Sequence, residues 1–171
     1  RDLIQATAIL ICSFLHPAIA QDKHHYQTDF SKEEFTERRM KIMEAIGNNA
    51  IAVIQGASGI PGFSVFRQAN TFYYLTGLES PHAYLLINGK NRQTTVYLPH
   101  RDEGMEQNQG KVLSAEDADL VKQLTGVDHV RGIEFLSANL IGTGLIRPPA
   151  PLLYTELSPA EIGNDSRDEL L

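Results

Sequence analysis

Two strand-like runs separated by a short turn constrain the fold of this chain more than any other feature. Residues 83–88 read AYLLIN, residues 93–98 read QTTVYL, and residues 89–92 between them read GKNR. β-Branched and aromatic residues on both arms of such a turn predict a β-hairpin. The sheet of this protein must therefore contain at least one antiparallel pair.

A helix and a buried strand are predicted before the hairpin. Ser31 and Glu34 have the spacing of a capping box, and apolar residues follow at helical spacing until Gly47. Gly47 is the expected C-cap. Residues 50–55, AIAVIQ, form a short apolar run that is typical of a buried strand.

The alternation of helices and strands continues after the hairpin. Ser114 is expected to cap a helix that runs to about Leu124 and stops at Gly126. The residue pattern then predicts a strand at 127–130, a helix at 132–141 and a last strand at 152–154. The whole pattern predicts an α/β domain with a mixed β-sheet and flanking helices.

The first twenty residues have the character of a secretory signal peptide. Residues 3–20 are mostly apolar and end in Ala18-Ile19-Ala20, an A-x-A cleavage pattern. Pro17 and the short length argue against a membrane-spanning helix. We expect a signal peptide over 1–20 cleaved after Ala20, a polar lead-in over 21–30, no stable membrane anchor, and a periplasmic or secreted protein.

Charge and cysteine content exclude several other functions. The net charge is −6 and no local cluster of Lys or Arg offsets it, so binding to nucleic acid is not expected. The single cysteine, Cys12, excludes an internal disulfide and a multi-cysteine metal site. The glycines at 56, 59 and 62 lack the Lys-Ser/Thr of a P-loop.

One segment resembles a known family. Residues 66–78 read FRQANTFYYLTGL, Pro81 and an apolar run follow, and residues 97–102 read YLPHRD. This pattern resembles the N-terminal domain of aminopeptidase P, of the creatinase/prolidase-type metallopeptidases. The resemblance spans about residues 30–155, and the F-R-Q…Y-L-T-G block is its specific part.

The resemblance implies both a fold and a division of labour. It implies an α/β domain with a ribonuclease-H-like motif over 31–157, followed by the start of a linker over 158–171. In such enzymes a separate catalytic domain holds two manganese ions and cleaves the bond before proline in a peptide substrate. The N-terminal domain shapes the substrate cleft and often forms the homo-oligomer interface. We therefore expect the partners to be the protein's own C-terminal catalytic domain and further copies of itself.

No catalytic residue and no metal ligand is assigned within these 171 residues. Two alternatives remain open: a stand-alone α/β binding or interaction module, and the N-terminal domain of a prolidase- or creatinase-like enzyme. Fold alone does not decide between these reactions.

Four residues are candidates for surfaces that face the substrate cleft or the catalytic domain: Arg67, Tyr74, His100 and Arg101. Arg67 lies in an apolar setting and should need carboxylate or carbonyl partners, because an unpaired buried guanidinium is costly. We favour a structural tie for Arg67 and Gln68, and an exposed loop around His100.

The aromatic block also has a structural interpretation. Asn70 is a possible N-cap of a short helical turn ended by Gly77. Phe72, Leu75 and Tyr84 are expected in the core beneath that turn.

Overall fold

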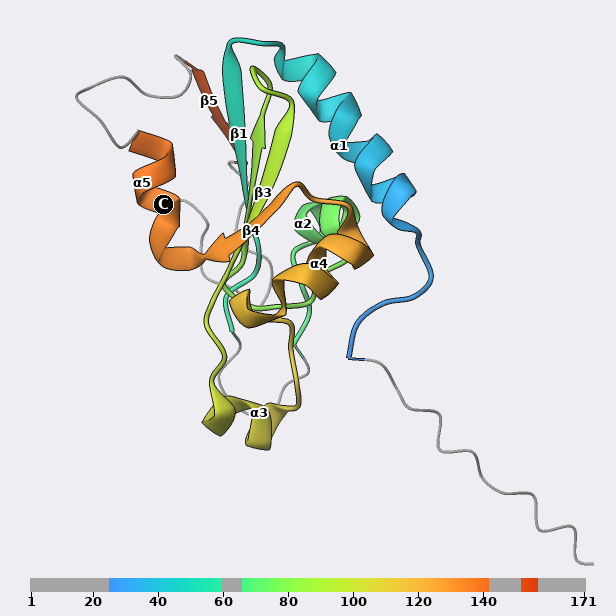
Figure 1. The fold of residues 1–171 in the computed structure, drawn as a ribbon, viewed down its shortest axis with the longest axis vertical. Coiled ribbons are helices and arrows are strands. Elements are labelled where there is room, and N and C mark those ends of the chain that lie inside the picture. Colours follow the sequence, from blue (N-terminus) through green and yellow to red (C-terminus); the bar gives the residue numbers. More distant parts are fainter. Residues whose placement is uncertain (1–24, 60–65, 142–151, 157–171) are drawn as a thin grey trace, which may run out of the picture.

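The computed structural model describes residues 25–59, 66–141 and 152–156. Twelve elements form these parts of the chain (Figure 1): α1 (Lys32–Ile46), β1 (Ala50–Gln55), α2 (Asn70–Thr76), β2 (Tyr84–Asn88), β3 (Gln93–Leu98), α3 (Glu103–Gln109), the 3-10 turn η1 (Ala115–Asp117), α4 (Ala118–Thr125), β4 (His129–Gly132), the 3-10 turn η2 (Ile133–Phe135), α5 (Leu136–Ile141) and β5 (Leu152–Thr155).

A mixed five-stranded sheet in the order β4-β3-β2-β1-β5 forms the centre of the molecule. Strands β1, β2 and β3 form an antiparallel meander, whereas β4 pairs parallel to β3 and β5 pairs parallel to β1. The predicted hairpin is confirmed, with Asn88 Oδ1 accepting the amides of Lys90 at 3.0 Å and Asn91 at 3.3 Å. The predicted α/β class with a mixed sheet and flanking helices is also confirmed.

Helix α1 begins and ends where its sequence predicts. The Ser31 hydroxyl accepts the Glu34 amide at 3.4 Å, and the Gly47 amide donates to Met43 O at 3.1 Å. The reciprocal half of the capping box is absent, because the Glu34 carboxylate pairs with Arg38 one turn later. The helix therefore has a simple serine cap.

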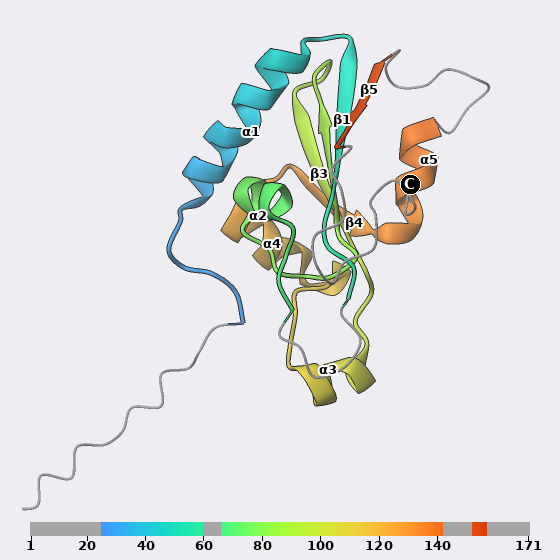
Figure 2. The same ribbon diagram turned by 180° about the vertical axis from the view of Figure 1, so that it is seen from behind.

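The two faces of the sheet are covered unequally. Helices α1, α2 and α4 lie on one face, and the main core fills the space beneath them with residues such as Phe72, Leu75 and Val121 (Figure 2). On the other face, Ile51, Val53 and Tyr97 form a smaller cluster against α5. The predicted core positions of Phe72 and Leu75 are confirmed, but Tyr84 is only half-buried and packs against the smaller cluster.

Two local predictions differ from the structure, and one helix lies where none was predicted. Asn70 is the first residue of α2 rather than its cap; Ala69 holds the cap position, and its amide donates to Gln68 Oε1 at 2.9 Å. Strand β4 begins at His129, two residues after the predicted start, because Val127 turns into the core. Helix α3 was not predicted from the sequence, since it has no apolar stripe.

The predicted signal peptide, its cleavage point after Ala20 and the linker at 158–171 lie outside the described residues. Within the described parts, no helix has the length and apolar character needed to cross a bilayer.

Candidate functional site

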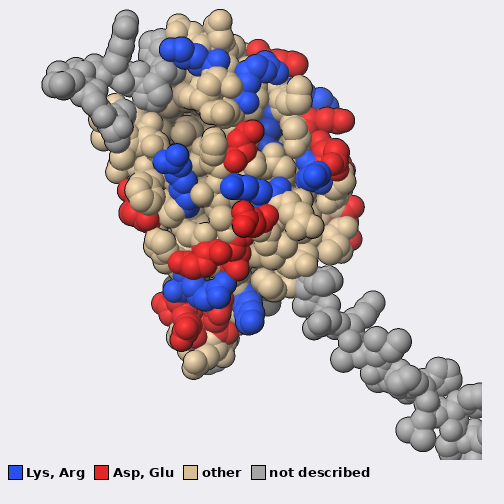
Figure 3. Space-filling model, viewed as in Figure 1, with Lys and Arg blue, Asp and Glu red and all other residues tan. Residues whose placement is uncertain are grey.

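The four candidate residues lie in three places. His100 and Arg101 follow the end of β3, Tyr74 lies on α2, and Arg67 precedes α2. Only His100 and Arg101 share a set of contacts. Charged residues of both signs gather at the lower end of the molecule, over α3 (Figure 3).

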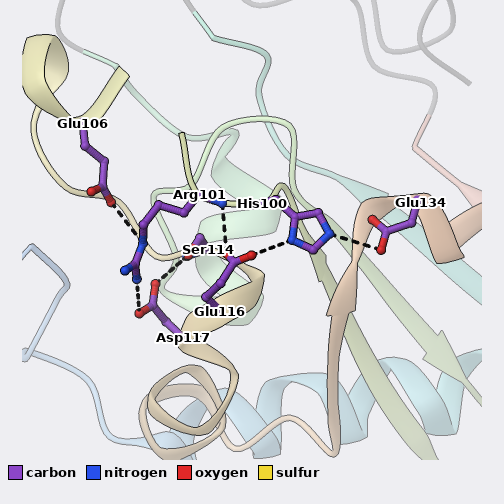
Figure 4. Close-up of polar contacts among 7 residues, drawn as sticks. All are labelled: His100, Arg101, Glu106, Ser114, Glu116, Asp117 and Glu134. Carbon is purple, nitrogen blue, oxygen red and sulfur yellow. Dashed lines mark hydrogen bonds and ion pairs between the residues drawn. The ribbon is translucent and has the colours of Figure 1, made fainter. Parts of the chain in front are cut away.

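The His100 side chain lies between two carboxylates from two 3-10 turns (Figure 4). Strand β3 ends at Leu98, and Pro99, which has no amide hydrogen, directs the chain out of the sheet. Nδ1 of His100 lies 2.6 Å from Glu116 Oε1, and Nε2 lies 3.2 Å from Glu134 Oε1. The hydrogen bonds to Glu116 and then Glu134 raise the pKa of His100 above its ordinary value.

Arg101 continues the same network toward α3 and α4. Its amide donates to Glu116 Oε2 at 2.9 Å, and its guanidinium lies 2.7 Å from Asp117 Oδ1 and 3.7 Å from Glu106 Oε1. Asp117 Oδ2 in turn accepts the Ser114 amide and hydroxyl, at 3.0 and 2.8 Å, which completes the capping box at η1. The predicted cap at Ser114 is therefore confirmed.

Among the acidic residues around His100 and Arg101, Glu116 has the most strongly shifted pKa. Its bonds from His100 and from the Arg101 amide lower the pKa of Glu116 to about 2. The cluster made of His100, Arg101, Glu116, Asp117 and Glu134, here called the His100 network, thus ties the segment after β3 to η1 and η2. The segment around His100 is exposed, as predicted for a loop. Ion pairs also fix its position.

The geometry of the His100 network does not suit a metal ion. The two glutamates bind opposite nitrogens of one imidazole, so no single point faces three ligands. Across the described ranges, no group of three or more His, Cys, Asp or Glu side chains is arranged to hold a metal. The network is a structural tie with an exposed surface.

A hollow of about 90 Å³ opens beside the network, between the segment at 80–82 and the segment at 99–114. Pro81, Pro99, Met105, Val112 and Leu113 contribute to its walls together with His100 and Arg101. Met105 and Val112 are more than one-third exposed, so the apolar side of the hollow is accessible.

Tyr74 forms one side of an aromatic box around Arg38. The Arg38 guanidinium lies 4.2 Å from the Tyr74 ring centre, 4.8 Å from Phe30 and 5.3 Å from Phe35. It also donates to Tyr74 O at 2.8 Å. Tyr74 remains 53% exposed, so its outer face is free to contact another surface.

Arg67 does not have the buried environment that its sequence neighbours suggested. Its side chain is exposed, and within the described parts of the chain it makes no hydrogen bond or ion pair. Arg67 and Gln68 were expected to fix a loop together, but only Gln68 makes such contacts. Gln68 Oε1 accepts the Ala57 amide at 2.5 Å, and Nε2 donates to Ser80 O at 2.8 Å.

The buried guanidinium of this fold belongs to Arg39. Arg39 is 1% exposed and donates to Leu75 O at 2.8 Å and Thr125 O at 2.7 Å, the carbonyls at the ends of α2 and α4. Burial lowers the pKa of Arg39 to about 10. The signal in the sequence is its place between Phe35 and Met43 at a spacing of four, on the buried stripe of α1.

The comparison with protein families decides the relationship. A family model described as "Aminopeptidase P, N-terminal domain" matches residues 35–143. The chain belongs to the aminopeptidase P N-terminal domain family. The resemblance carried by the F-R-Q…Y-L-T-G block is thus confirmed, and this block provides both α2 and the Gln68 tie.

The chain spans less than a third of the length of the relatives described here. It is 25% identical over 151 residues to Xaa-Pro aminopeptidase 3 of Dictyostelium discoideum, covering 84% of this chain and 28% of that protein. Escherichia coli aminopeptidase P with the inhibitor Pro-Leu has the same fold, with a TM-score of 0.64 at 20% identity over 80% of this chain and 31% of the enzyme. The zinc-substituted E. coli enzyme in complex with product matches with a TM-score of 0.54 at 23% identity, covering 63% of this chain and 26% of that enzyme.

Proposed function

We propose that this chain is the N-terminal accessory domain of an exported Xaa-Pro aminopeptidase. In this proposal it shapes the substrate cleft and an oligomer interface, and a domain that follows in the same polypeptide performs the hydrolysis. The family match over residues 35–143 supports the proposal most directly. The coverage of only 28% of a related Xaa-Pro aminopeptidase leaves room for that following domain.

The metal centre of the parent enzyme is proposed to lie in the following domain. Two manganese ions there would polarise the scissile carbonyl and activate a water molecule. The described residues of this domain do not fit such a centre, because no group of three potential metal ligands is arranged around one point. In this proposal the domain contributes surface and position, and the following domain contributes the chemistry.

Arg67, Tyr74, His100 and Arg101 are proposed to face the cleft or the catalytic domain. All four are exposed, and the hollow beside His100 and Arg101 has accessible apolar walls. The ion pairs of His100 and Arg101 hold these two side chains in defined positions. A surface fixed in this way loses little conformational entropy when another domain docks on it.

The test compares the full-length gene product with residues 21–171, both assayed with manganese on a peptide whose second residue is proline. The full-length protein should release the first residue, and the shorter chain should not. Activity in the shorter chain would refute the division of labour. Assays with an Xaa-Pro dipeptide and with creatine as further substrates distinguish an aminopeptidase from a prolidase-like or creatinase-like parent enzyme.

A matched pair of charge reversals tests the role of the surface. In the full-length protein, Arg67→Glu should raise KM or change the sedimentation coefficient, whereas Arg92→Glu in the exposed hairpin turn should change neither. Equal effects of the two variants would remove Arg67 from the proposed surface.

Export is part of the proposal and has its own test. N-terminal sequencing of the protein from its native cell fraction should begin at Gln21. A mature cytoplasmic protein that retains residues 1–20 would contradict export and leave the peptidase proposal untouched.

A further inference from the structure

The turn between β2 and β3 contains a dipeptide that is chemically reactive. Asn88 ends β2 and Gly89 follows it, and no other asparagine in the sequence precedes a glycine. In such a dipeptide the glycine nitrogen can attack the asparagine side-chain amide, because glycine has no side chain that hinders the approach. The turn therefore carries a candidate site of spontaneous deamidation.

Close packing explains why position 89 holds a glycine. The turn lies beside the connection between α1 and β1 (Figure 1). A Cβ on Gly89 would overlap the carbonyl oxygen of Gly47 and lie 3.1 Å from Ala50 O. Any larger residue at this position would push the hairpin away from the end of α1, so the fold itself requires glycine here.

The Asn88 side chain also contributes to the turn. Its Oδ1 accepts the amide of Lys90 at 3.0 Å and the amide of Asn91 at 3.3 Å. An apolar residue at this half-buried position would leave both amides without this acceptor. Both members of the reactive dipeptide are therefore used by the hairpin.

We propose that Asn88 is a deamidation site that is protected in the folded domain and reacts only when the hairpin of β2 and β3 opens. This inference does not depend on the proposed function. In the reaction, the Gly89 nitrogen loses its proton to a base and attacks Cγ of Asn88, ammonia leaves, and a succinimide ring forms. Water then opens the ring at either carbonyl and gives aspartate or isoaspartate.

The folded state blocks the first step of this reaction. Gly89 is buried and its amide donates to Ala50 O at 3.1 Å, so a base in the solvent cannot remove the amide proton unless the structure opens. The bonds from Lys90 and Asn91 also hold the Asn88 carboxamide over the turn. Ring closure must break these contacts, and it therefore requires local or global unfolding.

The two products differ in whether they still fit the hairpin. Aspartate keeps the backbone unchanged and offers a carboxylate oxygen to the same two amides, as a charged and stronger acceptor. Isoaspartate routes the main chain through the side-chain methylene and so lengthens it. That change disturbs the register in which Asn88 pairs with Ile51 and Gln93. The hairpin should therefore accept aspartate and reject isoaspartate.

The experiment incubates the full-length gene product at mildly alkaline pH, folded in buffer and unfolded in guanidinium chloride, with circular dichroism as the check of each state. Trypsin should then release residues 68–90 as one peptide, which contains Asn88 and, as an internal control, Asn70 before a threonine. Mass spectrometry should show Asn88 deamidating at least about tenfold faster in the unfolded protein, because unfolding frees the Gly89 amide. Asn70 should stay intact in both states.

Equal rates for Asn88 in the two states, or no reaction in the unfolded protein, would overturn the inference. Two variants test the products. Asn88→Asp should fold with the circular dichroism spectrum and urea midpoint of the wild type, whereas Asn88→Ala should unfold at lower urea because two turn amides lose their acceptor. An Asn88→Asp protein that unfolds as early as Asn88→Ala would show that the hairpin rejects aspartate as well, which overturns the predicted difference between the products.

Discussion

Replacing Arg39 by methionine tests the main buried polar contact of the fold. Methionine keeps the aliphatic stem and removes the guanidinium, so Leu75 O and Thr125 O lose their donors. Both carbonyls lie at helix C-termini, where no intrahelical amide is available and the helix dipole favours a cation. A buried acceptor without a partner costs about 1–3 kcal/mol, so two predict a loss of about 2–6 kcal/mol.

An opposing contribution limits the loss. Burial lowers the pKa of Arg39 from 12.5 to about 10, which at about 1.4 kcal/mol per pKa unit means that burial costs the charged form on the order of 3 kcal/mol. Methionine is relieved of that cost. Subtracting this cost from the loss of about 2–6 kcal/mol leaves a midpoint near 1 kcal/mol, so we expect Arg39→Met to lower the free energy of unfolding by about 1 kcal/mol and by no more than about 3 kcal/mol.

Urea unfolding followed by circular dichroism measures the loss, with an unchanged m-value as evidence that the denatured state is the same. Arg39→Lys should lie between methionine and wild type, because one ammonium cannot reach both carbonyls with arginine's fork geometry. Lys41→Met, at an exposed position of the same helix, should change stability by less than about 0.5 kcal/mol. An Arg39→Met protein as stable as wild type would refute the proposed role of the guanidinium.

Three further predictions concern other contacts. NMR titration should give His100 a pKa above 6.5 that falls toward 6.5 in Glu116→Gln. Because the pKa is raised in the folded state, the stabilisation from this contact is fully present below pH 6.5 and is lost as the pH rises through the folded pKa. An unchanged titration would contradict the pairing. Gln68→Ala should cost about 2–4 kcal/mol in urea unfolding, because buried backbone groups lose their partner, and a loss below about 0.5 kcal/mol would argue against the tie. Gly77→Ala should cost at least about 2 kcal/mol in the same assay, since its φ of +68° is strained for alanine and a Cβ overlaps the Phe35 ring; a neutral effect would contradict both causes.

The parts of the fold that were predicted correctly have local causes. Ser31 and Ser114 cap helices through their own side chains, and Gly47 ends α1 by its own backbone freedom. The hairpin follows from two β-prone arms and the turn between them. Such signals lie within a few residues of each other and can be recognised without the rest of the molecule.

The parts that were not predicted depend on contacts between distant segments. Arg39 and Arg67 are both arginines beside aromatic residues, yet only Arg39 meets helix ends that lie 36 and 86 residues away. His100 finds Glu116 and Glu134 only after α4 and β4 have folded back toward β3. Sequence motifs therefore indicated which segments carry the candidate residues. The tertiary structure was needed to show that Arg39, and not Arg67, is the buried arginine.

The parallel pairing of β1 with β5 also has a consequence for biosynthesis. Their partners Ala50 and Leu152 are about 100 residues apart, so at 5–20 residues per second a ribosome needs roughly 5–20 s to supply the second strand after the first. During that interval the nascent meander of β1, β2 and β3 has one hydrogen-bonding side of β1 unsatisfied. Slowing translation between these two strands should lengthen that vulnerable period and increase the demand for chaperones.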